Sequence, residues 1–191
     1  MHSERYILAK IKPEKMAEVE AAAKRISQNK PRYEAVSLTL ATGMPWWFVA
    51  IVHFMEGGGK FTKHLHNGDP LTARTVNVPK GRPVLGKAPF SWEESAIDAI
   101  QYMEGQNKIW RQLKGKWDME SILKKFEAYN GMGYQKKGLL SPYIYSYTQF
   151  YEKGKYAFDG KYDPNLVSKQ PGVIPLMKAL PQFTKDATLT F

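Results

Sequence analysis

Residues 45–59 read PWWFVAIVHFMEGGG, an apolar run that ends in one carboxylate and three glycines. The segment from Trp46 to Glu56 is apolar on nearly every side, which predicts a buried central helix rather than an amphipathic surface helix. Pro45 suits the start of such a helix, and the glycines at 57–59 end it. We therefore expect Glu56 to lie at the C-terminal end of a buried helix.

Apolar residues at helical spacing predict further helices on both sides of this segment. The predicted helices are Pro13–Gln28, one that begins at Pro31 and ends at Gly43, one that begins at Ser91, Trp117–Tyr129, and a final one over Val173–Leu180. Ser91 and Glu94 form a capping-box pattern. Leu71–Val78 has β-branched residues in partial alternation, so it predicts a small β-hairpin or an ordered loop.

These elements predict a mainly α (α+β) fold in one domain over residues 1–191. In it, a helical bundle surrounds the buried central helix and carries a small β-hairpin lobe. Residues 1–12 are polar and lack the apolar core of a signal peptide. The longest apolar run, residues 44–55, is shorter than the roughly 20 residues that a membrane span needs, so no span is expected.

The charge balance is basic, with 28 lysines and arginines against 18 acidic residues and a formal net charge of +10. Such a balance favours polyanions, among them nucleic acid, anionic lipid and a bacterial wall, although an ordinary solvated surface explains it equally. The aromatic residues are not interleaved with arginines and no nucleic-acid module is recognisable, so nucleic acid is not an expected partner. The chain has no cysteines, which excludes disulfides and thiolate chemistry.

Two effects at the end of the central helix are expected to raise the pKa of Glu56. Apolar surroundings disfavour the carboxylate, and the negative end of the helix dipole acts in the same direction. A carboxyl that stays neutral near about pH 6 to 7 can protonate a departing glycosidic oxygen, and the following glycines leave room for a polymer. The alternative is a solvent-facing residue that caps a core helix.

Two motifs resemble those of a known superfamily. Residues His53–Phe61, HFMEGGGKF, resemble the first motif of the lysozyme-like superfamily, especially its lytic-transglycosylase and goose-type branches. Residues Glu127–Tyr134, EAYNGMGY, resemble the Ala-Tyr-Asn-x-Gly motif of the same branches. The resemblance implies a lysozyme-like fold, Glu56 as the catalytic acid, and Tyr129 and Asn130 in the cleft near it.

The resemblance extends over most of the chain but has one gap. His64–Pro83 and Gly138–Gln170 are also similar to bacterial and phage lysozyme-like proteins, so it covers about Pro31 to Leu180. The Gly-Leu-Met-Gln motif that the branches carry between the two motifs is absent. Residues 66–74, HNGDPLTAR, take its place.

Because this middle motif is absent, the identity of the second catalytic group stays open. A hydrolase that uses two carboxylates needs a nucleophile or a base for water, and Asp69 is the candidate. Asp69 is also explained as a turn residue before Pro70. In that case a transglycosylase, which works with one glutamate and a group of the substrate itself, becomes the alternative.

Aromatic side chains suit a sugar-binding cleft, because pyranose faces stack on flat rings. The expected substrate-binding residues are Tyr129, Asn130, Tyr134, Tyr145, Tyr151, His66 and Thr72. For each tyrosine, packing in the core is the alternative.

Three histidines near Glu56 in the sequence offer a rival site. His53, His64 and His66 could hold zinc together with Glu56, as in a cell-wall amidase or peptidase. The spacing does not match His-Glu-x-x-His. The expected site therefore contains no metal and no cofactor, and His64 and His66 are expected to form hydrogen bonds at the surface or in the cleft.

The expected function is a peptidoglycan-cleaving glycosidase, a muramidase that cuts the MurNAc-GlcNAc β-1,4 bond with Glu56 as general acid. The expected partner is the glycan strand of the bacterial wall. We expect a monomer that reaches the periplasm or the cell exterior by phage release or by another export route. A non-catalytic module that binds a polyanion through its net charge is the third possibility.

Overall fold

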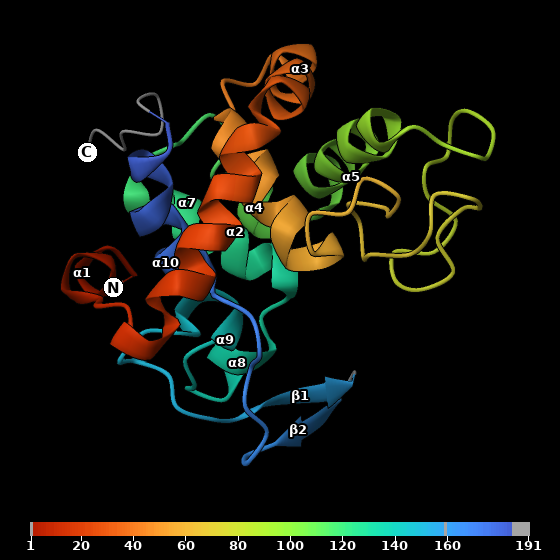
Figure 1. Cartoon of the computed structure of the whole chain (residues 1–191). Coiled ribbons are helices and arrows are strands. Elements are labelled where there is room, and N and C mark those ends of the chain that lie inside the picture. Colours follow the sequence, from red (N-terminus) through yellow and green to blue (C-terminus); the bar gives the residue numbers. More distant parts are fainter. Residues whose placement is uncertain (1, 159, 185–191) are drawn as a thin grey trace. The chain divides into compact units, whose positions relative to one another are not determined.

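The computed structural model of the chain describes residues 2–158 and 160–184. This part is mainly helical and contains a small two-stranded antiparallel hairpin, which confirms the predicted class at that level (Figure 1). The chain divides into two compact units, one made of Met1–Lys24 with Asp118–Phe191 and the other of Arg25–Trp117. The single domain over residues 1–191 stays a prediction.

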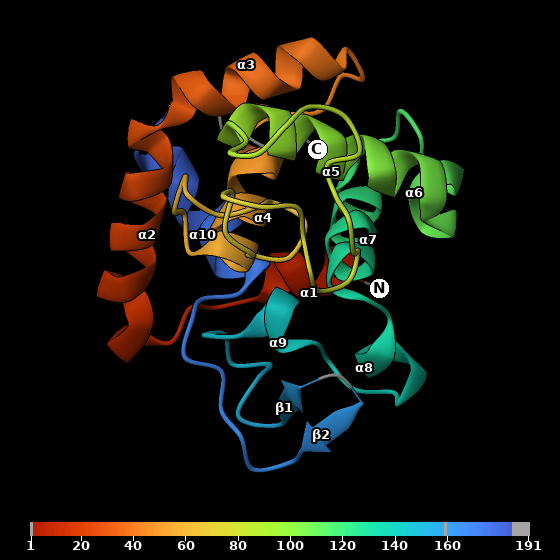
Figure 2. The same cartoon turned by 90° about the vertical axis from the view of Figure 1, so that its right-hand side faces the viewer.

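The unit Arg25–Trp117 is built around helix α4, Trp46–Gly57, which is buried from Trp46 to Met55 as its apolar sequence predicts. Its other helices are α3 (Lys30–Leu40), α5 (Trp92–Gln106) and α6 (Lys108–Gln112), preceded by the last turn of α2 (Met16–Gln28). Helix α3 packs against both α4 and α5, and Figure 2 shows α3 alongside α5.

Local signals set the ends of these helices. Ser91 caps α5 with the predicted capping box: its hydroxyl accepts the Glu94 N–H at 3.2 Å, and the Glu94 carboxylate accepts the Ser91 N–H at 2.8 Å. Gly58 closes α4 in the left-handed conformation, with φ 62°. Helix α3 ends earlier than predicted, because Ala41 rather than Gly43 closes it, with φ 52°.

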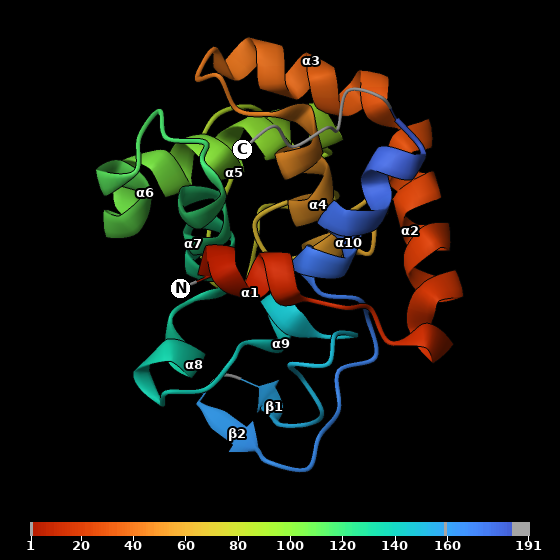
Figure 3. The same ribbon diagram turned by 90° about the vertical axis from the view of Figure 1, so that its left-hand side faces the viewer.

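The unit Met1–Lys24 with Asp118–Phe191 holds the remaining elements. They are α1 (His2–Leu8), η1 (Pro13–Lys15), α2 as far as Lys24, α7 (Met119–Asn130), α8 (Gly133–Lys136), α9 (Pro142–Tyr145), β1 (Lys155–Phe158), β2 (Lys161–Asp163), α10 (Val173–Ala179) and η2 (Leu180–Gln182). Helix α7 contacts α1 and α9, and α9 contacts α10. Figure 3 shows α1 beside α7. The predicted helices at 13–28, 117–129 and 173–180 are confirmed within two residues at each end, the first beginning as η1.

The hairpin is fastened to α8 through one tyrosine. In the antiparallel pair β1–β2, Tyr156 lies opposite Tyr162. The Tyr134 ring of α8 contacts both, with centroids 5.0 and 6.3 Å away. The Tyr134 hydroxyl also accepts the Tyr156 N–H at 3.0 Å. This anchor positions β1 beside the start of α8.

The hairpin β1–β2 does not lie in the segment for which the sequence predicted a β-hairpin. Leu71–Val78 contains no strand and is an ordered loop, which was the other prediction for that segment. The N–H of Val76 bonds to the side chain of Asp69 at 2.9 Å instead of to a partner strand, and the nearby prolines offer no N–H for a ladder. Within residues 2–158 and 160–184 no helix has the length and apolar character that crossing a membrane requires.

Candidate functional site

Glu56 lies in the last turn of α4, where the helix leaves the core. The residues that precede it in the helix are buried, whereas Glu56 itself is half-buried. The Gly58 N–H bonds back to the Phe54 carbonyl at 2.9 Å and completes the helix end. The predicted position of Glu56, at the C-terminal end of a buried helix, is confirmed.

The loop after α4 folds back against this helix end at Gly68. A Cβ on Gly68 would lie 2.6 Å from the Glu56 carbonyl oxygen, and the φ of Gly68 is +79°. The Gly68 N–H bonds to the His64 carbonyl at 2.9 Å. Arg25 donates to the Gly58 carbonyl at 2.6 Å. Contacts from Arg25 and from the loop at Gly68 therefore hold the backbone around Glu56.

Replacing Gly68 with alanine is expected to destabilise the protein by about 2 to 4 kcal/mol, because the new Cβ meets the Glu56 carbonyl and the left-handed backbone is strained. Gly81→Ala is the matched control, since Gly81 has the same φ of +79° and no atom within 4 Å of its Cβ position. We expect Gly81→Ala to cost only about 1 to 2 kcal/mol. Equal losses in urea unfolding of the two variants would contradict the close packing on Glu56.

Asp69 holds the loop together through its carboxylate. Oδ2 accepts hydrogen bonds from the N–H groups of Val76 at 2.9 Å and Asn77 at 3.0 Å and from the Asn67 amide at 3.2 Å, while Oδ1 accepts from the Asn77 amide at 2.7 Å. Burial acts to raise the pKa of Asp69, but these hydrogen bonds outweigh it and the pKa is lowered. Asp69 has the geometry of the turn residue that the sequence allowed.

His64 and His66 both form hydrogen bonds with side chains of α5. His64 pairs through Nδ1 with the Ser95 hydroxyl at 2.8 Å, and its Nε2 donates to the Ala73 carbonyl at 2.8 Å. His66 lies 2.8 Å from Asp98 through Nε2 and is buried. Across residues 2–158 and 160–184, no three histidine, aspartate or glutamate side chains come together to hold a metal ion. The zinc alternative therefore has no support from the geometry.

His53 is enclosed by aromatic rings. Its Nδ1 lies 3.0 Å from the Tyr33 hydroxyl, and its ring centroid lies 4.6 Å from those of Phe61 and Trp92. Burial lowers the pKa of His53 to about 4, and the positive charge of Arg32 adds to the effect. His53 is thus a neutral core residue at neutral pH.

The protein is expected to lose stability as the pH falls from 6.5 toward 4. His53, with a folded pKa of about 4, stays neutral in the folded chain while the unfolded histidine binds a proton below its ordinary pKa of 6.5. Unfolding then takes up protons, so the free energy of unfolding falls by about 1.4 kcal/mol per pH unit for this residue. Urea unfolding between about pH 4.5 and 7.5 should show a shallower slope in His53→Gln; an unchanged slope would disprove the assignment.

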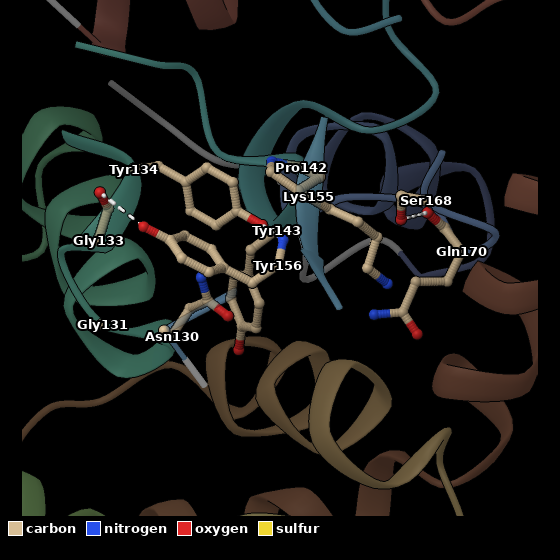
Figure 4. Close-up of a pocket in the computed structure, with 11 residues that line it drawn as sticks. Asn130, Gly131, Gly133, Tyr134, Pro142, Tyr143, Lys155, Tyr156, Ser168 and Gln170 are labelled. Carbon is tan, nitrogen blue, oxygen red and sulfur yellow. Dashed lines mark hydrogen bonds between the residues drawn. The ribbon is translucent and has the colours of Figure 1, made fainter. Parts of the chain in front are cut away.

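A pocket of about 500 Å³ lies in the unit that contains Asp118–Phe191 (Figure 4). Its lining residues are Asn130, Gly131, Gly133, Tyr134, Pro142, Tyr143, Lys155, Tyr156, Gly160, Ser168 and Gln170. Asn130 and Tyr134 were predicted as binding residues, and the structure brings them together here. Glu56 belongs to the other unit.

The other predicted binding residues do not line this pocket. Tyr145 is fully buried, with 0% of its surface exposed, and its hydroxyl lies 2.8 Å from His2 Nδ1. Tyr151 is buried and its hydroxyl accepts the Ser168 N–H at 3.1 Å. These two tyrosines pack in the interior, which was the alternative to sugar binding for each tyrosine. Tyr129 is half-buried, and Thr72, in the other unit, is exposed.

Sequence reasoning missed the hairpin residues of the pocket, Lys155 and Tyr156. The signal was the Asp-Gly pair at 159–160, which stands between two Lys-Tyr pairs. Asp-Gly between short aromatic runs is a strong local indication of a two-residue hairpin turn. Ser168 and Gln170 had no comparable signal, because they reach the pocket from an irregular segment. Comparison of the chain with protein-family models, curated proteins and solved structures finds no match.

Proposed function

We propose that the protein is a peptidoglycan-cleaving glycosidase that acts on the MurNAc-GlcNAc β-1,4 bond with Glu56 as general acid. The observation that carries the proposal is the place of Glu56, a half-buried carboxyl at the end of the apolar helix α4. A carboxyl group at this position has a proton to donate to a glycosidic oxygen that comes within hydrogen-bond reach. Protonation of the departing oxygen is the step that glycosidic cleavage requires.

The second lysozyme-like motif supports the same proposal. Glu127–Tyr134 spans the end of α7 and the start of α8, and it contributes Asn130 and Tyr134 to the pocket. An amide and a flat ring are suited to the hydroxyl groups and the apolar face of a sugar. The net charge of +10 favours association with the anionic wall.

The hydrogen bonds that the Asp69 carboxylate accepts favour the transglycosylase form of this activity. A nucleophile or base needs a lone pair directed at the substrate, whereas the Asp69 carboxylate accepts four hydrogen bonds within its own loop. In the form with one glutamate, Glu56 protonates the glycosidic oxygen as the C1–O bond breaks. A hydroxyl of the same sugar then attacks C1 and returns its proton to Glu56, which leaves a 1,6-anhydro end.

The protein is expected to release soluble dye from dye-labelled, insoluble peptidoglycan at some pH between about 4 and 8. A chelator should leave the release unchanged, because the proposed step needs only a carboxyl group. Loss of release with chelator and its recovery with zinc would favour the amidase alternative. Sedimentation with the wall without any release would favour the non-catalytic binding module.

A further inference from the structure

The pocket of Figure 4 contains one positively charged side chain that has no partner among the described residues. Lys155 is the charged residue among the described lining residues. It is half-buried, and its ammonium makes no hydrogen bond, ion pair or ring contact within residues 2–158 and 160–184. An uncompensated ammonium at a concave surface favours an anionic ligand.

The pocket also contains hydrogen-bond donors besides Lys155. Within the described residues the side-chain amides of Asn130 and Gln170 have no hydrogen-bond partner. The Tyr134 hydroxyl accepts the Tyr156 N–H and keeps its own hydrogen to donate. Burial raises the pKa of Tyr134, so this hydrogen is retained at neutral pH. Acceptor oxygens of a ligand satisfy these donors, and hydroxyl groups of the ligand can donate to the two amide oxygens.

Figure 4 shows how the groups are divided within the pocket. The ends of the Lys155 and Gln170 side chains point toward each other on one side, and the rings of Tyr134, Tyr143 and Tyr156 lie on the other. A carboxylate can accept from an ammonium and an amide at once. The tyrosine rings offer flat faces on which an aliphatic ring packs.

We propose that this pocket binds a pyranose that carries a carboxylate, with the carboxylate at Lys155 and Gln170 and the sugar ring against the tyrosines. The volume of about 500 Å³ lies within the range of small-molecule sites. Two sources share this chemistry: N-acetylmuramic acid of the wall and the uronic acids of other polysaccharides. The choice of a sugar rests on the proposed function, whereas the choice of an anion rests on Lys155 alone.

Matched sugars test the proposal by NMR titration of the full chain at low salt. N-acetylmuramic acid is compared with N-acetylglucosamine, and glucuronate with glucose, because each pair differs in the carboxylate-bearing group. We expect at least one acid to bind about tenfold more tightly than its neutral counterpart, with shifts at Lys155 and Gln170. The tighter-binding acid identifies the source.

Three variants separate this site from general charge attraction. Lys155→Gln should abolish the preference for the acid and leave the neutral sugar unaffected, and Lys155→Arg should keep the preference. Lys161→Gln, on β2 of the same hairpin and outside the pocket lining, removes the same charge and should keep it too. Equal binding of acid and neutral sugar, or equal losses in Lys155→Gln and Lys161→Gln, would overturn the proposal.

Single sugars have no glycosidic bond to cleave, so this titration is independent of Glu56. A carboxylate preference without wall cleavage would refute only the proposed function. Wall cleavage without the preference would refute only the pocket assignment.

Discussion

Replacing Glu56 with glutamine is expected to slow peptidoglycan cleavage by about 10² to 10⁴-fold, the range that a general acid contributes. Glutamine keeps the shape and the helix propensity of glutamate but has no proton of suitable acidity to give. We therefore expect the thermal unfolding curve of Glu56→Gln to match that of the wild type within a few degrees. Dye release from labelled wall, measured over about pH 4 to 8, gives the rate.

Glu34→Gln is the control for this experiment. Glu34 lies on α3 in the same unit as Glu56 and pairs with Lys30 at 3.4 Å, with 42% of its side chain exposed. The substitution makes the same charge change, so its release rate should equal that of the wild type. Full activity in Glu56→Gln, or an equal loss in both variants, would exclude Glu56 as the acid.

Replacing Asp69 with alanine is expected to lower the free energy of unfolding by about 2 to 4 kcal/mol. The change removes a buried acceptor and leaves the N–H groups of Val76 and Asn77 without their partner. Asp69→Asn keeps one acceptor oxygen, so we expect about half of this loss. Urea unfolding at neutral pH measures both variants; a loss below about 0.5 kcal/mol in Asp69→Ala would contradict the role in holding the loop.

The effect of Asp69 also depends on pH in a predictable direction. Because its pKa in the folded chain is lowered, its contribution is complete above the ordinary aspartate pKa and is lost as the pH falls through the lower folded value. The difference in stability between wild type and Asp69→Asn should therefore shrink below about pH 4.

The activity of Asp69→Asn separates the two forms of the proposed reaction. With one glutamate at work, the folded variant should cleave the wall at close to the wild-type rate. With two carboxylates at work, it should lose activity about as severely as Glu56→Gln. A stable but inactive Asp69→Asn would therefore restore the hydrolase with Asp69 as its second group.

The features predicted well from the sequence were those that local signals determine. The apolar run at 46–55 indicates a buried helix wherever it occurs, and so Glu56 was placed correctly at its end. The capping box of Ser91 and Glu94 likewise depends on residues three apart. Spacing and residue type are sufficient for such features.

The features missed depend on partners that are distant in the sequence. Leu71–Val78 has strand-forming residues, yet the carboxylate of Asp69 takes up its backbone N–H groups, and this competition is not visible in a residue pattern. Tyr145 is fully buried, although its aromatic ring made it a candidate for sugar binding in the sequence. Lys155 and Gln170 line the same pocket as Asn130 only through the packing of separate segments. Tertiary contacts decide where these residues lie, and a residue pattern does not show such contacts.

The role of Glu56 is tested most directly by mass spectrometry of the fragments that the wild type and Glu56→Gln release from purified peptidoglycan. We expect glycan fragments with 1,6-anhydro ends from the wild type and, in the same time, about a hundredfold fewer or less from the variant. Equal amounts of such fragments from both proteins, or fragments cut only at peptide or amide bonds, would contradict this role.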